Sequence, residues 1–102
     1  MSMLHVVNKS PFEKTSLDSC LVYAKERAAI LLIEDAVYAA LKGTAFAEKV
    51  KTALKICKVY ALEPDIKARG MDVAKVIDGV ELVGYGEFVD LAATYDNVHS
   101  WV

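Results

Sequence analysis

The chain has 102 residues, 55% of them hydrophobic and 25% charged, with a formal net charge of −2. This length suits one domain that buries a core without a metal or disulfide. The hydrophobic share exceeds the roughly 45–50% of average globular domains, so we expect some apolar surface to contact partners. The charge balance, without a basic block, gives no indication of direct nucleic-acid binding.

Location is constrained by what the sequence lacks. No apolar run approaches the roughly 20 residues of a membrane span, and no secretory signal is recognisable at the start. The two cysteines form no CxxC motif. We therefore expect reduced thiols and a cytoplasmic protein without a membrane anchor.

The first third of the chain predicts a strand, a loop, a helix and a second strand. Met3–Val7 predicts a buried strand, and residues 8–15 predict a polar loop containing Pro11. Ser16 or Thr15 can cap the helix that follows. The apolar residues of this helix recur at helical spacing: Leu17, Cys20, Leu21, Ala24 and Ala28. Residues 29–33 are all apolar and predict a central strand that is covered on both faces.

The middle of the chain predicts two helices and a strand. Residues 37–41 predict a short helix that Gly43 ends. Thr44 is expected to cap a third helix. The inward side chains of that helix are Phe46, Val50, Ala53 and Leu54. Residues 59–62 predict a third buried strand.

The last third predicts a helix, an outer strand and a final helix. Pro64 opens a short helix that closes at Arg69-Gly70, and residues 80–83 predict a fourth strand at the outside of the sheet. The final helix carries the apolar stripe Phe88, Leu91, Ala92 and Tyr95. No element is assigned to residues 99–102.

Strands that alternate with helices of about 10–12 residues indicate βαβ units. The fold class predicted is therefore α/β: a single three-layer domain over residues 1–102, with a mostly parallel sheet of four to five strands and helices on both faces. No linker or internal repeat divides the chain.

Several chemistries lack their motif. The first strand-to-helix loop has no glycine to bind phosphate, and no GxSxG elbow of a serine hydrolase is present. Histidines and cysteines are scattered singly, so neither a metal site nor a cofactor is predicted. The acids of a phospho-accepting receiver domain would follow the first strand, whereas here they follow the second.

Glu34 and Asp35 stand directly after the central strand, where ligands bind in open α/β sheets. Adjacent carboxylates could raise one another's pKa and perform acid–base chemistry. The alternative, which we favour because no partner base or nucleophile is visible, is that Asp35 caps the following helix while Glu34 faces water.

Cys20 is the candidate catalytic residue. It is expected one turn inside a helix, on the side shared with Arg27, and both the helix N-terminus and a cation lower a thiol pKa. A nucleophilic or persulfide-carrying cysteine requires that lowering. The alternative is a small core side chain. Cys57 is expected to be structural, and lysines 49, 51 and 55 are expected to form a solvated face.

Segments along nearly the whole chain resemble the DsrH/TusB family in the same order. They are Leu4-His5, Asn8-Lys9-Ser10-Pro11-Phe12, Leu31-Leu32-Ile33-Glu34-Asp35-Ala36-Val37-Tyr38-Ala39-Ala40, Val59-Tyr60-Ala61-Leu62, Asp65, Ala68-Arg69-Gly70, Tyr85, Phe88-Val89-Asp90-Leu91 and Ser100-Trp101. Two positions depart from the family pattern. Ala36 replaces the glycine usual after the acids, and Gly84 stands where an aspartate is common.

The resemblance implies a subunit of a cytoplasmic sulfur-relay complex that handles persulfide sulfur. Such a complex is a heterohexamer with two copies each of this subunit, a DsrE/TusD-like sister and a DsrF/TusC-like sister, and it passes sulfur to a downstream acceptor protein. TusBCD serves 2-thiolation of the tRNA wobble uridine, and DsrEFH serves dissimilatory sulfur oxidation. The principal sulfur-carrying cysteine belongs to the DsrE/TusD-type sister.

Members of the oxidative branch resemble this chain in having a cysteine where Cys20 stands, which favours the DsrH side. The leading hypothesis makes Cys20 a persulfide-accepting thiol. The first alternative is a structural subunit that carries no sulfur, and the second is a stand-alone α/β binding module.

Overall fold

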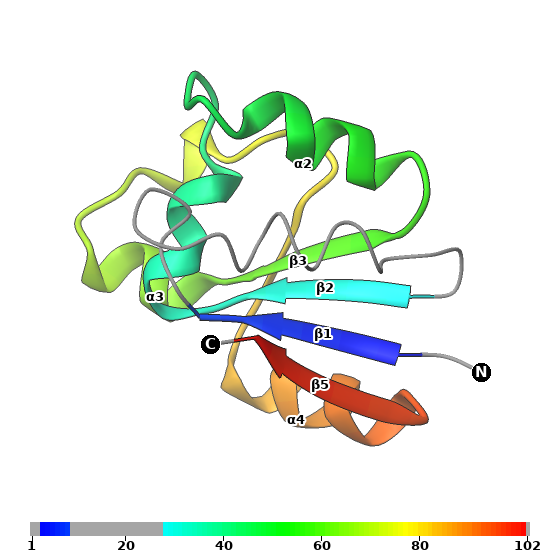
Figure 1. Cartoon of the computed structure of the whole chain (residues 1–102). Coiled ribbons are helices and arrows are strands. Elements are labelled where there is room, and N and C mark those ends of the chain that lie inside the picture. The colour runs from blue at the N-terminus through cyan, green and yellow to red at the C-terminus, as the bar shows by residue number, and fades with distance from the viewer. Residues whose placement is uncertain (1–2, 9–27, 102) are drawn as a thin grey trace.

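The computed structural model describes residues 3–8 and 28–101. Strands and helices alternate along the chain (Figure 1). The elements are β1 (Met3–Val7), β2 (Ala28–Leu32), the 3₁₀-helix η1 (Glu34–Ala40), α2 (Ala47–Leu54), β3 (Lys58–Leu62), α3 (Glu63–Ala68), the 3₁₀-helix η2 (Val73–Lys75), β4 (Glu81–Val83), α4 (Tyr85–Thr94) and β5 (Asn97–Trp101).

The five strands form one sheet in the order β4-β3-β2-β1-β5, and every pair is parallel. β2 lies in the middle, and its five residues are all buried. An element with neighbours on both edges and cover on both faces must be apolar throughout, which is why this stretch reads as an unbroken apolar run. The predicted α/β class, parallel sheet and central strand are confirmed.

The two faces of the sheet are covered by different connections. The chain moves from β2 to β3 to β4 in one direction across the sheet, and α4 then returns to β5 at the opposite edge (Figure 1). Because βαβ crossovers are right-handed, a connection that reverses direction must pass over the other face. The prediction of helices on both faces is therefore confirmed.

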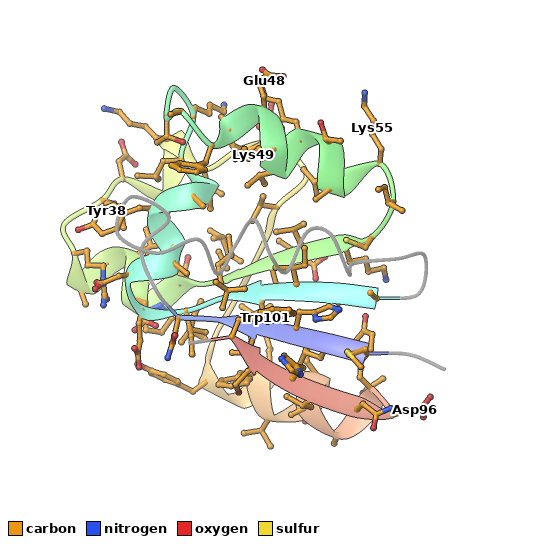
Figure 2. All side chains as sticks on the ribbon, viewed as in Figure 1. Tyr38, Glu48, Lys49, Lys55, Asp96 and Trp101 are labelled. Carbon is orange, nitrogen blue, oxygen red and sulfur yellow. The ribbon has the colours of Figure 1, made fainter. Side chains whose placement is uncertain are left out.

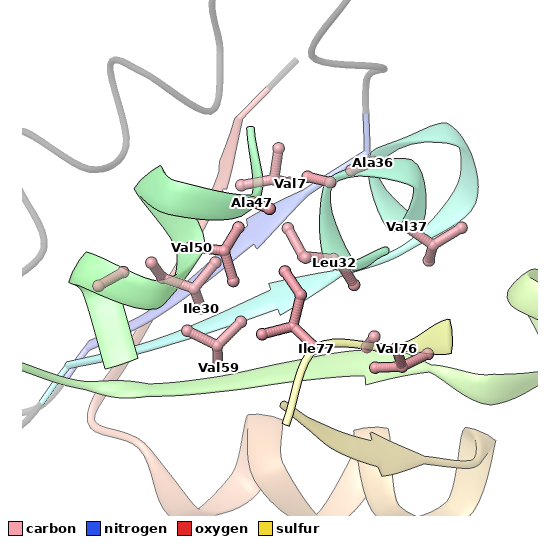
Figure 3. Close-up of a cluster of buried hydrophobic side chains, with 14 of the residues drawn as sticks. Val7, Ile30, Leu32, Ala36, Val37, Ala47, Val50, Val59, Val76 and Ile77 are labelled. Atoms are coloured by element: carbon pink, nitrogen blue, oxygen red, sulfur yellow. The ribbon is translucent and has the colours of Figure 1, made fainter. Parts of the chain in front are cut away.

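The larger core lies between the sheet and the face that carries η1 and α2 (Figure 3). From the sheet it takes Val7, Ile30, Leu32, Val59 and Ala61, and from the helices it takes Ala36, Val37, Ala47, Val50, Ala53 and Ile66. Each large aliphatic side chain buried there contributes about 1.5–3 kcal/mol relative to exposure.

The smaller core lies on the opposite face, under α4. It contains Leu4, Val6, Ala29, Leu31, Tyr60, Leu62 and Val83, and it is covered by Phe88, Leu91, Ala92 and Tyr95 of α4. These four residues are the stripe predicted for the last helix. No residue of α4 is itself fully buried, so this single helix covers its face less completely than the helices opposite.

Several element boundaries differ from the prediction. The helix after β2 is a 3₁₀-helix that begins at Glu34, three residues before the predicted start. Ala28 is the first residue of β2, whereas the prediction placed it on the apolar stripe of a helix before that strand. Thr44 does not cap α2: the N-cap is Phe46, and the Thr44 hydroxyl donates a hydrogen bond to the Leu41 carbonyl oxygen at 3.2 Å.

The C-terminal residues form a fifth strand that the sequence did not predict. β5 pairs with β1 from Met3 opposite Asn97 to Val7 opposite Trp101. The predicted outer position of the fourth strand is confirmed, since β4 forms the other edge of the sheet. Among the described helices, none is long and apolar enough to cross a membrane.

Candidate functional site

Cys20 and Arg27, the predicted reactive pair, lie outside the described residues. The other predicted candidates, Glu34 and Asp35, lie at the carboxyl end of β2. Both side chains are exposed at the start of η1.

Glu34 adopts a left-handed backbone conformation, with φ of +49°. This conformation costs a residue with a Cβ roughly 1–2 kcal/mol. The strained turn directs the Glu34 backbone N–H toward α3, where it donates a hydrogen bond of 2.6 Å to Oδ2 of Asp65. The carboxylate of Asp65 thus offsets the strain by accepting an N–H at a helix start.

Asp35 is held by a cation and not by the helix that it was predicted to cap. Nε of Arg69 donates a hydrogen bond to Asp35 Oδ1 at 2.9 Å. The residue that precedes η1 is Ile33, with no side-chain capping bond. The predicted cap is therefore wrong, because Arg69 takes the carboxylate that would have bonded to the helix N–H groups.

Arg69 contacts Asp65 as well as Asp35. Its terminal guanidinium nitrogen donates to the Asp65 backbone carbonyl at 3.2 Å and lies 4.0 Å from Asp65 Oδ1. Glu34, Asp35, Asp65 and Arg69 form what we call the β2–α3 latch. Asp35, Asp65 and the backbone N–H of Glu34 are bonded within the chain, and no base or nucleophile is among their partners, so the acid–base interpretation of Glu34 and Asp35 gains no support.

Cys57 is chemically quiet, as predicted. Its side chain is buried, and its Sγ donates a hydrogen bond to the Ala53 carbonyl oxygen at 3.4 Å. Burial raises the pKa of the Cys57 thiol above its ordinary value. Since the thiolate is the nucleophile, this cysteine stays protonated and unreactive near neutral pH.

A histidine–tryptophan contact joins β1 to β5. His5 is only 3% exposed, and Trp101 Nε1–H donates a hydrogen bond of 3.1 Å to its Nδ1. Nδ1 is then the acceptor, so the proton of the neutral ring sits on Nε2. His99 completes the cluster, with its ring centroid 4.6 Å from that of Trp101 and 6.4 Å from that of His5.

This cluster was not found from the sequence. The position of His5 inside an apolar run indicates burial, but its partner lies 96 residues away. Within residues 3–8 and 28–101, no group of three or more His, Cys, Asp or Glu side chains could hold a metal ion.

The lysines of α2 and of its C-cap form the predicted solvated face; Lys49 and Lys55 are labelled in Figure 2. Lys49, Lys51 and Lys55 are all exposed. Lys51 lies 3.6 Å from Glu48, and the ammonium group of Lys49 lies 5.1 Å from the centroid of the Phe46 ring.

The chain is thus a small α/β domain with an open five-stranded parallel sheet, in which an acid–arginine contact joins the turn after β2 to the region of α3. The family model described as "DsrH like protein" matches residues 9–98. Relatives include Protein TusB of Salmonella typhimurium, 39% identical over 101 residues, and Protein TusB of Pectobacterium atrosepticum, 34% identical over 99 residues. Each alignment covers 97% of this chain and all of the relative. The chain belongs to the DsrH/TusB family.

Solved structures share the fold. The ychN protein from E. coli is 21% identical, with a TM-score of 0.80 and 99% of both chains covered. Protein Tm0979 from Thermotoga maritima is 28% identical, with a TM-score of 0.62, covering 91% of this chain and 92% of its own.

The two departures from the family pattern have simple local consequences. Ala36 is fully buried, and among the described residues Glu34 is the non-glycine residue with positive φ, so position 36 does not need glycine. Gly84 is the N-cap of α4, and its N–H donates to Glu87 Oε1 at 3.0 Å. A glycine has no side chain to return that bond, so only half of a capping box is present.

The latch predicts an unequal response to two charge deletions on α3. Asp65→Ala leaves the Glu34 N–H unpaired and removes a partner of Arg69, so we expect a loss of about 1–3 kcal/mol in unfolding free energy. Lys67→Ala removes only the exposed pair of Lys67 with Glu63, at 3.8 Å, and should cost less than about 0.5 kcal/mol. Urea unfolding measures both, and equal losses would contradict the latch.

The His5–Trp101 contact predicts a pH dependence of stability. Burial, and to a lesser extent His99, lowers the pKa of His5 below 6.5. The unfolded chain therefore binds the proton more readily, and the contribution of neutral His5 is lost as pH falls below about 6.5. Thermal unfolding at pH 7.5 and 5.5 should show a smaller drop in Tm for His5→Gln, which does not titrate, than for the wild type. An equal drop in both would exclude His5 as the cause.

Proposed function

We propose that this chain is a subunit of a sulfur-relay complex that handles persulfide sulfur. The observation that carries the proposal is the match to the DsrH-like family over residues 9–98, together with TusB relatives that align over their full length. In this proposal the chain works in the cytoplasm beside DsrE/TusD-like and DsrF/TusC-like sisters in a heterohexamer. That complex passes sulfur to a downstream acceptor protein.

Two pathways are candidates, each favoured by a different observation. The relatives named TusB favour 2-thiolation of the tRNA wobble uridine. Cys20 favours dissimilatory sulfur oxidation, because members of the oxidative branch have a cysteine at this place, whereas members of the tRNA branch can lack it. Neighbouring genes that encode tRNA-modifying enzymes would support the first pathway, and sulfite-reductase-like neighbours would support the second.

Within the complex we propose Cys20 as a persulfide-accepting thiol. The sequence contains two cysteines, and Cys57 is buried, hydrogen-bonded and raised in pKa. A sulfur carrier on this chain is therefore Cys20. The helix N-terminus or Arg27 would favour its thiolate.

The transfer is an exchange without net oxidation. The Cys20 thiolate attacks the outer sulfur of a donor persulfide, R–S–SH, and the donor S–S bond breaks as the new one forms. The donor leaves as the thiolate R–S⁻, and Cys20 becomes a persulfide that retains the transferred proton. A rival role, in which the chain is a structural subunit, needs none of these steps.

Intact-mass analysis of the reconstituted complex after loading with a persulfide donor separates the two roles. We expect this subunit to gain the mass of one sulfur atom in the wild type and in Cys57→Ser. The same subunit should gain none in Cys20→Ser.

The matched cysteine variants give the experiment its control. Cys57→Ser keeps a hydroxyl that can donate to the Ala53 carbonyl oxygen, so the complex should still assemble. Sulfur only on a sister subunit, with full transfer by the Cys20→Ser complex, would support the structural role and contradict sulfur carriage by this chain.

A further inference from the structure

The outer side of β5 is open to another strand. β1 pairs with its inner side from residue 97 to residue 101, and within the described part of the chain no strand pairs with its outer side. The four residues Asn97–Ser100 are all exposed. Backbone N–H and C=O groups of alternate residues therefore point outward without a strand partner, which is a template for strand addition.

The two edges of the sheet are built differently. β4 has three residues and carries the exposed charge of Glu81, and short length and charge are both common protections of an edge. β5 has five residues and contains no Lys, Arg, Asp, Glu or Pro. One edge is protected against pairing and the other is not, which points to a partner at β5.

We propose that β5 pairs antiparallel with β5 of a second copy of this chain, about a two-fold axis at His99, so that the two sheets join into one. This contact goes beyond the proposed function, because two copies can form it without any sister subunit or sulfur chemistry.

Strand geometry selects the position of the axis. In an antiparallel pair, residues that face each other are either both hydrogen-bonded across the pair or both not. Outward-pointing residues alternate along β5, so facing residues must be an even number apart, and the axis passes through a residue. An axis at His99 pairs all of Asn97–Trp101, whereas one at Val98 or Ser100 leaves two residues at one end unpaired.

The side chains of β5 can face those of β5 in a second copy of the chain. An axis at His99 places Val98 opposite Ser100 of the second copy and Asn97 opposite Trp101 of the second copy. None of these four side chains is ionisable, so no like charges face each other in these pairs. The pairing also covers Val98, one of the large hydrophobic side chains left exposed, at 48%. A self-compatible neutral edge selects a second copy over a partner chosen by charge.

A charge swap at His99 tests the contact with the full-length chain. His99→Lys and His99→Glu each place two like charges opposite each other at the axis, with Cβ atoms about 4.5–5.5 Å apart. We expect each variant alone to raise the dimer dissociation constant at least about tenfold. An equimolar mixture of the two should restore a dimer, because opposite charges then meet.

Sedimentation velocity over a concentration series measures the association. Glu81→Lys changes charge at the opposite edge and should leave the dimer intact, while circular dichroism checks that every variant is folded. A monomeric wild type, open-ended aggregates, or a dimer that survives in both single variants would each overturn the proposal. Dimer recovery on mixing would support it, because a misfolded variant cannot recover by meeting another.

Discussion

The burial of β2 at the middle of a parallel sheet determines where the other elements lie. Its neighbours β1 and β3 satisfy both backbone edges, and cores on both faces take its side chains. Because β2 is paired on both edges and covered on both faces, none of its five residues is polar, and exposed acids appear just after its end. Glu34 follows that end after a single residue, Ile33, and the sharp turn there sets the position of η1.

The turn after β2 is strained, and the latch holds it. The left-handed backbone of Glu34 is maintained by the Asp65 carboxylate, and Arg69 ties Asp35 and Asp65 together. Glu34 and Asp35 stand 31 and 34 residues before Asp65 and Arg69, respectively, yet the four residues are in contact in the structure. They lie at the carboxyl edge of the sheet, where open α/β domains bind their ligands. Their hydrogen bonds, however, join the turn after β2 to α3 and Arg69.

Much of the fold follows from local sequence pattern. Apolar runs predict β1 to β4, the parallel sheet follows from the alternation of strands and helices, and the stripe of α4 follows from helical spacing. β5 was missed because its residues are mostly exposed and show no apolar alternation, and its order comes from pairing with β1.

The candidate site is less accessible to such reasoning. Asp35 has the right residue type for a cap, but a cation 34 residues away binds it instead. The Trp101–His5 bond spans 96 residues, so no local pattern reports it. Residue types predict which interactions are possible at a position, and long-range contacts decide between them. Cys57 could be judged correctly because burial alone determines its chemistry.

Asp35 and the backbone of Glu34 are bound within the latch, so neither carboxylate is needed for the proposed transfer of sulfur through the Cys20 thiol. The most direct measurement is the rate of sulfur transfer by the reconstituted complex carrying Glu34→Gln and Asp35→Asn together. Both amides keep side-chain size and remove the charge required for acid–base catalysis. We expect a transfer rate within about twofold of the wild type, since neither carboxylate takes part in the exchange. A loss of more than about tenfold in a complex that still assembles, equivalent to about 1.4 kcal/mol of activation free energy, would contradict it.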